Sequence, residues 1–379
     1  MRAAPEPQDS MMINKLELDT PCLVLDLDIL EQNIRKMQSI AVQAGKSLRP
    51  HAKTHKCSSL ARMQLEAGAR GICAAKVSEA EALVNAGFDD ILITGPVATP
   101  YKLVRLVALV EKCPSLKVVL DDLAIVEILD MMLGEKGLTM AVYLDIDVGL
   151  RRTGVKPSNA LGLAERIASC PNLRLVGVQA YAGQVQHIPS FAERRDNSLR
   201  CLEDAVAAFR EIRERVPGCT TLSTSGTGTF DIDMEIAEVS ELQVGSYVLM
   251  DTEYLDIGSA EDSKRFTAFE PALRLLTSVI SANHETHVTV DAGLKSLYRD
   301  GGVPRLAGPA SSALSYDWYG DEYGMIRASG GEPLPAPRAV LELLVSHCDP
   351  TVNLFDFYHL TRGEEVVGKW PIDLRGCSQ

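Results

Sequence analysis

A lysine stands between two histidines in the segment RPHAKTHK, which covers residues 49–56. The segment follows an apolar run, and in an extended strand His51 and Lys53 share one face because side chains alternate with period two. A lysine at the mouth of a barrel is partly desolvated, which lowers its pKa and suits it to Schiff-base formation. The alternative interpretation is a surface lysine in a basic turn.

Two further polar segments contain candidates for ligand binding. In residues 145–154 (DIDVGLRRTG) the glycines let the backbone turn beneath a ligand, and an arginine is available for an oxyanion. Residues 179–187 (QAYAGQVQH) form an unusually polar exit from an apolar run and include Tyr181 and His187. A lone histidine is more often structural than catalytic, so both interpretations of His187 stay open.

Glycine and hydroxyl residues gather in residues 223–229 (STSGTGT) and 245–247 (GSY). Such segments expose backbone N–H groups and favour a phosphate ligand. The first segment is not G-x-G-x-x-G and opens no first βα unit, so a dinucleotide site is disfavoured, and neither segment is a P-loop. An ordinary turn is the alternative.

A histidine and an aspartate near the C-terminus have the spacing of a small metal site. His347 and Asp349 are two residues apart, so in extended chain they project to one side while Cys348 points away. One imidazole and one carboxylate, with the other positions left to water or substrate, suit Mn²⁺ or Mg²⁺. The tripeptide is common, and a turn at the end of a strand is the alternative.

The elements that must position these residues follow an alternating pattern. Short β-branched runs alternate with amphipathic helical stretches, which predicts a (β/α)8 TIM barrel with its active site at the carboxyl ends of the strands. An open doubly wound sheet is the alternative fold. The eight predicted strands are residues 48–53, 71–75, 90–94, 116–120, 140–147, 173–181, 220–226 and 239–250.

After about residue 251 the apolar runs come with turn signals and few long helices, which predicts a second, mostly β domain. Its predicted runs are residues 273–281, 287–293, 338–347 and 364–370. Residues 20–30 read as a strand that runs into a helix and pairs with this domain. The predicted division is a barrel over residues 28–255, and a β domain from residues 1–27 plus 256–379.

Two capping-box patterns predict where helices begin. The spacing Asp28-x-x-Glu31 would cap a helix over residues 29–44, and Ser78-x-x-Glu81 would cap the helix that follows the second predicted strand.

Charge and composition exclude several classes of partner. The 379 residues contain 38 Lys and Arg against 51 Asp and Glu, so the formal net charge is −13 and nucleic acid or anionic membrane is a poor partner. No apolar run approaches the roughly 18 residues of a membrane helix, and the first ten residues lack a hydrophobic core segment. The nine cysteines include no C-x-x-C pair, which favours reduced thiols. A cytoplasmic protein is the expectation.

Taken together, the segments resemble the metal-activated, pyridoxal-phosphate-dependent D-threonine aldolases, within the group that shares the alanine racemase-type barrel. The similar segments run in order from about residue 19 to residue 353, and their combination is far more specific than any one motif. They are DTPCLVLDLD, LRPHAKTHK, ARGICAAKVSEAEALVNAG, DVGLRRTGV, GVQAYAGQVQH, SGTGT, ELQVGSYVLMD, VDAGLKS and SHCDPTVN. The resemblance implies a PLP fold type III barrel with a β domain, a small amino acid as substrate, and a homodimer.

The resemblance also assigns roles by position. Lys53 would hold pyridoxal 5'-phosphate as a Schiff base, Arg152 would lie near the phenolic oxygen of the cofactor, and Tyr181 near its ring. His347 and Asp349 would hold the divalent cation, Mn²⁺ or Mg²⁺. The residues implied for the phosphate are Ser225, Gly226, Thr227, Gly245, Ser246 and Tyr247.

The implied reaction is retro-aldol cleavage of D-threonine or D-allo-threonine to glycine and an aldehyde. His187 is the first choice for the base that takes the β-hydroxyl proton, with His51 or a metal-bound hydroxide second. Two departures from the family pattern concern the aldehyde pocket, because Ala182 and Tyr323 stand where histidines are common.

Three rival functions stay open. The first is a D-serine or 3-hydroxyaspartate dehydratase on the same scaffold, although such dehydratases typically have His-x-Cys where this chain has His347-x-Asp349. The second is an amino-acid racemase, which needs no metal. The third is a non-catalytic barrel that binds pyridoxal phosphate, which the additional domain argues against.

Overall fold

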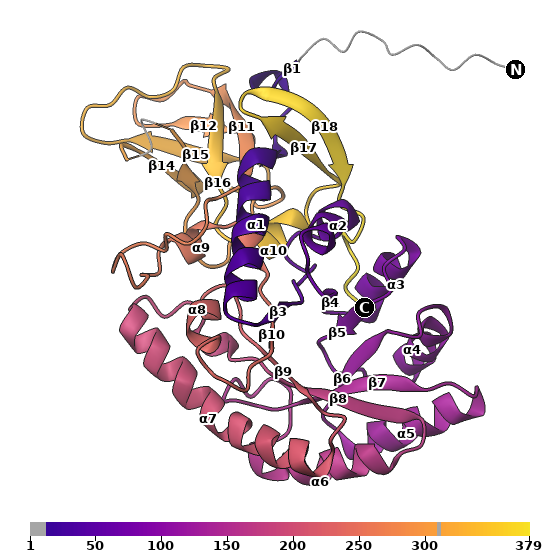
Figure 1. Ribbon diagram of the computed structural model, residues 1–379. Helices are drawn as coiled ribbons and strands as arrows, with labels where there is room; N and C mark the ends of the chain where they lie inside the picture. Colours follow the sequence, from indigo (N-terminus) through magenta and orange to yellow (C-terminus); the bar gives the residue numbers. More distant parts are fainter. Residues whose placement is uncertain (1–12, 309–311) are drawn as a thin grey trace, which may run out of the picture.

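The computed structural model describes residues 13–308 and 312–379, and it contains two β-sheets. Figure 1 shows a barrel surrounded by helices, with a second sheet packed at one end of it. Residues 1–12 and 309–311, which belong to the predicted β domain, lie outside the described part of the chain.

The first sheet has eight parallel strands in the order β3-β10-β9-β8-β7-β6-β5-β4. A parallel bridge between His51 and Cys73 joins the two ends, and the Cys73 N–H donates to Pro50 O at 2.8 Å. The strands therefore close into the predicted barrel. They are β3 (Ser47–Leu48), β4 (Ile72–Ala74), β5 (Ile91–Ile93), β6 (Lys117–Leu120), β7 (Met140–Asp145), β8 (Leu173–Ala180), β9 (Thr221–Thr224) and β10 (Glu241–Leu242).

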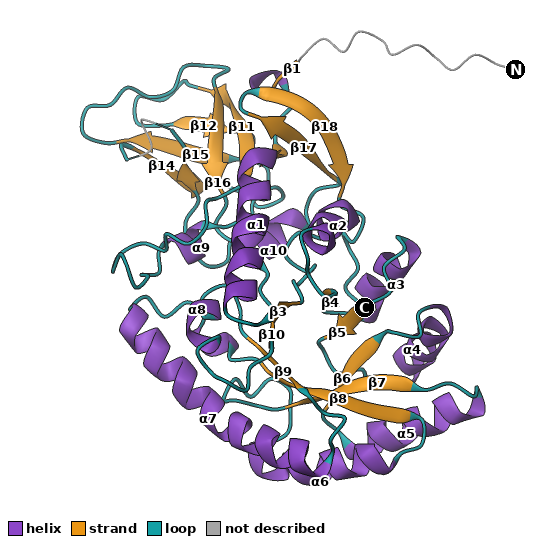
Figure 2. Cartoon of the chain, viewed as in Figure 1, coloured by secondary structure: helices purple, strands orange, loops and turns teal. Residues whose placement is uncertain are grey.

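Helices cover the outside of this barrel (Figure 2). Each long helix buries one apolar face against the strands, such as Leu103, Leu106 and Val110 of α4, which is the expected pattern for a helix on a sheet. The helices of this part are α1 (Leu27–Gln43), α2 (Ser58–Glu66), α3 (Val77–Asn85), α4 (Pro100–Lys112), α5 (Leu123–Glu135), α6 (Pro157–Ser169), α7 (Phe191–Arg215), α8 (Phe230–Asp233) and α9 (Thr252–Leu255), with the 3₁₀ turns η2 (Gly183–Val185) and η3 (Ser246–Val248). No described helix is long and apolar enough to cross a membrane.

The second sheet has ten strands, of which two precede the barrel strands in the sequence and eight follow them. Strand β2 pairs antiparallel with β11 and parallel with β17, so the prediction that residues 20–30 pair with the β domain is confirmed. The strands are β1 (Ile13–Asn14), β2 (Cys22–Asp26), β11 (Leu273–Ser281), β12 (Val288–Val290), β13 (Arg305–Leu306), β14 (Leu314–Trp318), β15 (Gly324–Ala328), β16 (Val340–Leu344), β17 (Phe357–Arg362) and β18 (Glu365–Pro371); η1 (Lys15–Glu17) and α10 (Cys348–Val352) complete this part.

The structure corrects both predicted helix caps. Asp26, not Asp28, accepts the first free N–H groups of α1, those of Asp28 and Ile29. Lys76 is the N-cap of α3 and provides no side-chain bond. Ser78 instead bonds to Gln379 and Glu81 to Arg105, so tertiary contacts occupy the two side chains of the predicted capping box.

Two predicted strands are much shorter than expected. Residues 48–53 contain only the end of β3, because Pro50 has no N–H to donate and residues 52–55 turn. Residues 239–250 contain only β10, and η3 follows it. The carboxyl ends of these two strands therefore carry turns, which point side chains and N–H groups into the mouth of the barrel.

Candidate active site

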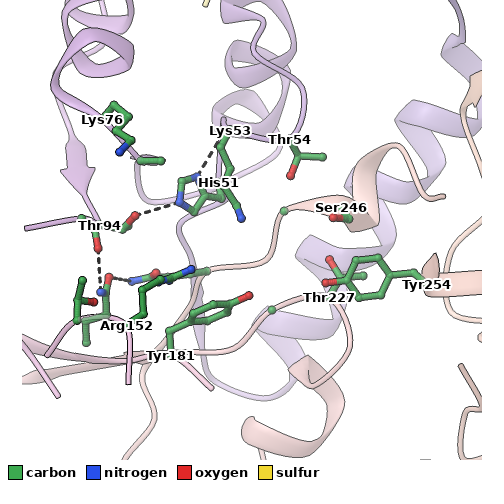
Figure 3. A pocket seen from close by; sticks show the side chains of 17 residues that line it. His51, Lys53, Thr54, Lys76, Thr94, Arg152, Tyr181, Thr227, Ser246 and Tyr254 are labelled. Atoms are coloured by element: carbon green, nitrogen blue, oxygen red, sulfur yellow. Dashed lines mark hydrogen bonds between the residues drawn. The ribbon is translucent and has the colours of Figure 1, made fainter. Parts of the chain in front are cut away.

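A cavity of about 380 Å³ lies at the carboxyl ends of the barrel strands, where the fold predicts an active site. Figure 3 shows Thr227 and Ser246 on one side of it and Lys76 on the other, with Lys53 between them. Eight of the site residues predicted from the sequence line the cavity: His51, Lys53, Arg152, Tyr181, Gly226, Thr227, Gly245 and Ser246. Three other residues of the predicted polar segments, Thr54, Thr153 and Gln179, line it as well.

Lys53 lies in a turn after β3 rather than in the strand, so its shared face with His51 is not a consequence of strand alternation. The β domain holds this turn from behind: the Tyr358 hydroxyl donates to His55 O at 2.7 Å, and Leu374 N–H donates to Lys56 O at 2.9 Å. The turn is thus fixed by long-range contacts.

The Lys53 ammonium lies 3.4 Å from Asp349 Oδ2. This carboxylate raises the pKa of Lys53, which corrects the expectation that desolvation would lower it. Lys53 in turn offsets the burial of Asp349, whose pKa is lowered. A residue of the barrel and a residue of the β domain therefore meet at one point.

His51 forms the wall of the cavity beside Lys53 (Figure 3). Its Nδ1 accepts the N–H of Lys53 at 3.3 Å, which leaves Nε2 to carry the proton and donate to Thr94 Oγ1 at 3.0 Å. Burial lowers its pKa well below the usual range. Both ring nitrogens are therefore engaged, and His51 is fixed as a neutral imidazole.

Arg152 enters the cavity from the loop after β7, and its guanidinium carbon lies 5.7 Å from the centre of the Tyr181 ring. Carboxylates hold this loop. Thr153 Oγ1 donates to Asp145 Oδ2 at 2.8 Å, and the Gly149 N–H donates to Asp147 Oδ1 at 2.9 Å. These hydrogen bonds fix the loop that carries Arg152, and the guanidinium charge is available for an oxyanion.

The opposite end of the cavity has the form of an anion cradle. We call residues 225–229 the phosphate loop. A Cβ at Gly228 would collide with the carbonyl oxygen of Gln186, and one at Gly245 would lie 2.7 Å from Thr54 Oγ1, so both close approaches require glycine. Within the described residues, the N–H groups of Thr227 and Ser246 have no protein acceptor.

The other two residues predicted for the phosphate lie behind this cradle. Tyr247 is buried, and its hydroxyl accepts a bond from Gln64 Nε2 at 3.0 Å. Ser225 has a positive φ of 78° and its hydroxyl lies 3.1 Å from Thr224 Oγ1. Neither side chain lines the cavity, so they shape the loop rather than face a ligand.

His347 and Asp349 lie at the start of α10, and Asp349 is the one that contacts Lys53. His347 is extended as expected and is the N-cap of α10, whereas Asp349 lies within the helix, so the expected extended conformation does not continue to Asp349. Two acidic side chains flank the imidazole: His347 Nδ1 lies 3.4 Å from Asp300 Oδ2 and 3.9 Å from Glu253 Oε2.

The polar atoms of this pair are incompletely bonded. His347 Nδ1 and Asp349 Oδ1 are buried and lack a hydrogen-bond partner, which is costly unless a ligand completes them. Among the described residues, no three His, Cys, Asp or Glu side chains converge into a ready-made metal site. A cation would therefore need water or substrate as further ligands.

Asp251 joins the barrel to this pair. It is fully buried, its Oδ2 accepts the Cys348 N–H at 3.0 Å, and its Oδ1 accepts the Tyr254 N–H at 3.1 Å. One carboxylate thus caps both α9 and α10, and we call it the Asp251 bracket. It sets the position of α10, which carries Asp349, relative to α9.

His187 lies on the α9 side of the same region. Its Nδ1 is 3.3 Å from Glu253 Oε1, its ring centre is 4.4 Å from that of Tyr254, and its buried Nε2 has no hydrogen-bond partner. Burial lowers its pKa to about 4, so the imidazole is neutral at pH 7. Glu253 therefore orients a neutral ring whose second nitrogen is free to accept a proton.

The two departures from the family pattern lie away from the cavity lining. Ala182 is 3% exposed, and its carbonyl accepts a bond from Gln186 Nε2 at 3.2 Å. Tyr323 is 46% exposed in the turn before β15.

Several residues of the site were not predicted from the sequence. Thr94 and Gln243 line the cavity, and their position at the end of an apolar run or within one was a usable signal. Glu253 and Tyr254 gave no such signal, because they belong to a four-residue helix placed by tertiary contacts.

Comparison with known proteins agrees with this arrangement. Residues 25–253 match the model for the alanine racemase N-terminal domain, and residues 272–361 match a putative serine dehydratase domain. A D-threonine aldolase of Arthrobacter sp. is 37% identical over 96% of this chain and 94% of its own. A 3-hydroxy-D-aspartate aldolase of Paracoccus denitrificans is 36% identical with the same coverage.

Among solved structures, that of D-threonine aldolase from Filomicrobium marinum superposes with a TM-score of 0.92, at 33% identity and over 100% of both chains. The similarity thus covers both sheets and the helix that carries His347 and Asp349. The chain belongs to the family of alanine racemase-type barrel enzymes that includes the D-threonine aldolases.

Proposed function

We propose that this protein is a D-threonine aldolase, which cleaves D-threonine and related D-β-hydroxy-α-amino acids to glycine and an aldehyde. The proposal rests chiefly on the distance of 3.4 Å between Lys53 Nζ and Asp349 Oδ2. A barrel lysine suited to a cofactor and a metal-type pair from the β domain thereby act on the same small volume. The relatives at 36–37% identity are named as aldolases of D-amino acids.

The residues of the cavity fit pyridoxal 5'-phosphate. Free N–H groups at Thr227 and Ser246 suit its phosphate, Lys53 suits its aldehyde, and Arg152 suits its phenolic oxygen. When bound, this cofactor supplies an electron sink for the carbanion left at Cα. We propose that the barrel unit, residues 28–255, binds the cofactor.

We further propose that the β unit, residues 1–27 and 256–379, supplies a divalent cation site at His347 and Asp349. The fit rests on their buried, unpartnered Nδ1 and Oδ1 atoms. A carboxylate and an imidazole with open positions favour a hard cation such as Mn²⁺ or Mg²⁺. Such a cation lowers the pKa of a bound hydroxyl.

The chain's own residues then divide the remaining work. His187 accepts the β-hydroxyl proton at Nε2, and Glu253 holds the ring through Nδ1, which also stabilises the charge that the ring acquires. His51 is the weaker candidate for this base, because both of its nitrogens are bonded. It is better placed to hold the cofactor ring against Lys53.

The second candidate function is β-elimination from D-serine or 3-hydroxyaspartate, which releases ammonia and a 2-oxo acid. The match of residues 272–361 to a serine dehydratase domain favours it. The two reactions differ in the proton removed, since the aldolase needs a base at the β-hydroxyl and the dehydratase needs one at Cα. The unpartnered Nε2 of His187, which could take the β-hydroxyl proton, favours the aldolase.

Product analysis with purified protein, pyridoxal phosphate and Mn²⁺ separates these reactions. D-Threonine, L-threonine, D-serine and 3-hydroxy-D-aspartate are incubated separately, and glycine, aldehyde, ammonia and 2-oxo acid are quantified. Equal amounts of glycine and acetaldehyde from D-threonine alone among the threonine isomers support the proposal. Ammonia and 2-oxo acid as the main products overturn it in favour of the dehydratase.

Resemblance to the family also leads us to propose a homodimer. Light scattering on the purified protein tests this: a mass of two chains supports it and a mass of one chain contradicts it.

A further inference from the structure

Arg194 is a fully buried arginine on α7, behind the phosphate loop. Its Nε donates to Gly228 O at 2.8 Å, Nη1 to Ile188 O at 2.7 Å and Nη2 to Gly258 O at 2.5 Å. One guanidinium therefore joins the phosphate loop, the residue that follows His187, and the chain just beyond α9. The catalytic roles proposed above make no use of it.

The contact with Gly228 fixes the back of the phosphate loop. The carbonyl of Gly228 accepts from Arg194, and its N–H donates to Gln186 Oε1 at 3.0 Å, so both polar groups of this residue are engaged away from the cavity. Gly226 and Thr227 line the cavity instead. The orientation of the loop toward a ligand therefore depends on the bonds behind it.

The charge of Arg194 is only partly compensated by the protein. Its three hydrogen-bond partners are neutral carbonyls, and its guanidinium carbon lies 5.4 Å from the centre of the Phe191 ring. Asp231 interacts with this charge, but within residues 13–308 and 312–379 no carboxylate forms a direct ion pair with Arg194. Burial lowers its pKa, opposed by the charge of Asp231, but a guanidinium stays protonated. An unpaired buried cation is costly, and an anion in the adjacent cradle would offset that cost.

We propose that Arg194 is a positioning residue for the cofactor's phosphate group, holding the phosphate loop in its binding geometry and adding a buried positive charge behind it. The inference rests on the proposed use of pyridoxal 5'-phosphate. It concerns a residue that does not touch the cofactor, and it predicts an effect that depends on the phosphate alone.

The test compares two ligands that differ only by the phosphate. Pyridoxal 5'-phosphate and pyridoxal are each titrated into the full-length protein, and the dissociation constants are taken from the absorbance of the Lys53-bound form. In R194Q the dissociation constant for pyridoxal 5'-phosphate should rise about 10- to 100-fold, while that for pyridoxal changes less than about 3-fold. The ratio to compare is the dissociation constant of pyridoxal divided by that of pyridoxal 5'-phosphate, and R194Q should reduce it. R194K keeps the charge but cannot span three carbonyls, so its ratio should fall between those of wild type and R194Q.

Two control variants on the same helix separate positioning from general destabilisation. R195Q makes the same chemical change at an exposed arginine paired with Glu235, and L202A removes a buried side chain eight residues further along α7. Both should keep the wild-type ratio of the two dissociation constants. If R194Q does not fold, R194K carries the test.

The outcomes distinguish this inference from the proposed function. A wild-type ratio in the Arg194 variants overturns the positioning role. If L202A reduces the ratio as much as R194Q does, the positioning role is also overturned, because the effect would then follow the loss of stability alone. A wild-type protein that binds neither ligand saturably would instead contradict the proposed function.

Discussion

The substitution D251N should destabilise the protein, because the Asp251 bracket accepts two buried backbone N–H groups. In D251N the side chain keeps one oxygen, so only one of the two N–H groups, those of Tyr254 and Cys348, retains its acceptor. The other N–H then faces an amide NH₂ in a fully buried site. Losing one hydrogen bond to a charged group and leaving a buried donor unsatisfied costs about 2–3 kcal/mol.

This loss should lower the melting temperature by roughly 4–9 °C, since each kcal/mol corresponds to about 2–3 °C in a chain of this size. Because the bracket sets the position of α10, Mn²⁺ affinity should fall as well, by about 5- to 50-fold. The assay is calorimetry with and without Mn²⁺ at pH 8, where the carboxyl is ionised although burial raises its pKa to about 6. D122N is the matched control, because Asp122 caps α5 through a single exposed bond to Ile125 N–H. A D251N protein with wild-type melting temperature and wild-type Mn²⁺ affinity would show that the Asp251 bracket neither stabilises the fold nor positions α10.

Three further predictions address the base, the cofactor lysine and a buried carboxyl. H187N should reduce kcat by about 10²- to 10⁴-fold while the dissociation constant for pyridoxal phosphate stays within about 3-fold, as steady-state kinetics and absorbance titration will measure; an unimpaired kcat would remove His187 as the base. K53A should abolish the absorbance of the covalently held cofactor together with activity, and an unchanged spectrum would contradict the assignment of Lys53. Asp233 accepts bonds from Ser198 and Thr229 hydroxyls, and burial raises its pKa to about 6, so its stabilising contribution is complete below about pH 4 and is lost as the pH rises through 6. D233N lacks this pH dependence. Its free energy of unfolding in urea minus that of wild type should therefore be about 2–3 kcal/mol more favourable at pH 7.5 than at pH 4. An equal difference at the two pH values would show that Asp233 does not titrate in this range.

The barrel could be predicted because burial leaves a direct trace in the sequence. All eight apolar runs fall on barrel strands, since strands covered by helices need apolar side chains on both faces. Their lengths could not be predicted in the same way. Residues 241–250 are buried throughout, in β10 and in η3 alike, and burial does not distinguish a paired strand from a 3₁₀ turn.

Residues in the loops that follow barrel strands were predictable as cavity residues, whereas details of conformation set by distant contacts were not. Lys53, Arg152 and Thr227 line the cavity because each lies in the segment after the carboxyl end of a strand. The conformation of Asp349 was mispredicted, because α10 begins at Cys348, whose N–H donates to Asp251, 97 residues away. Arg194 lies in the charged run FAERRDNSLR and cannot be told there from its exposed neighbour Arg195.

The barrel cavity and the β-domain pair His347 and Asp349 are proposed to act on one substrate. Glycine formation from D-threonine, measured in chelator-treated protein as Mn²⁺ is added back, tests this proposal in wild type, D349N and D356N. Asp356 is an exposed partner of Arg375, so D356N should behave as wild type. Glycine formation should be lost with the chelator, return with Mn²⁺ in wild type and D356N, and stay low in D349N although cofactor absorbance is retained. Glycine formation that persists in the chelator, or that runs at full rate in D349N, would contradict joint action on one substrate.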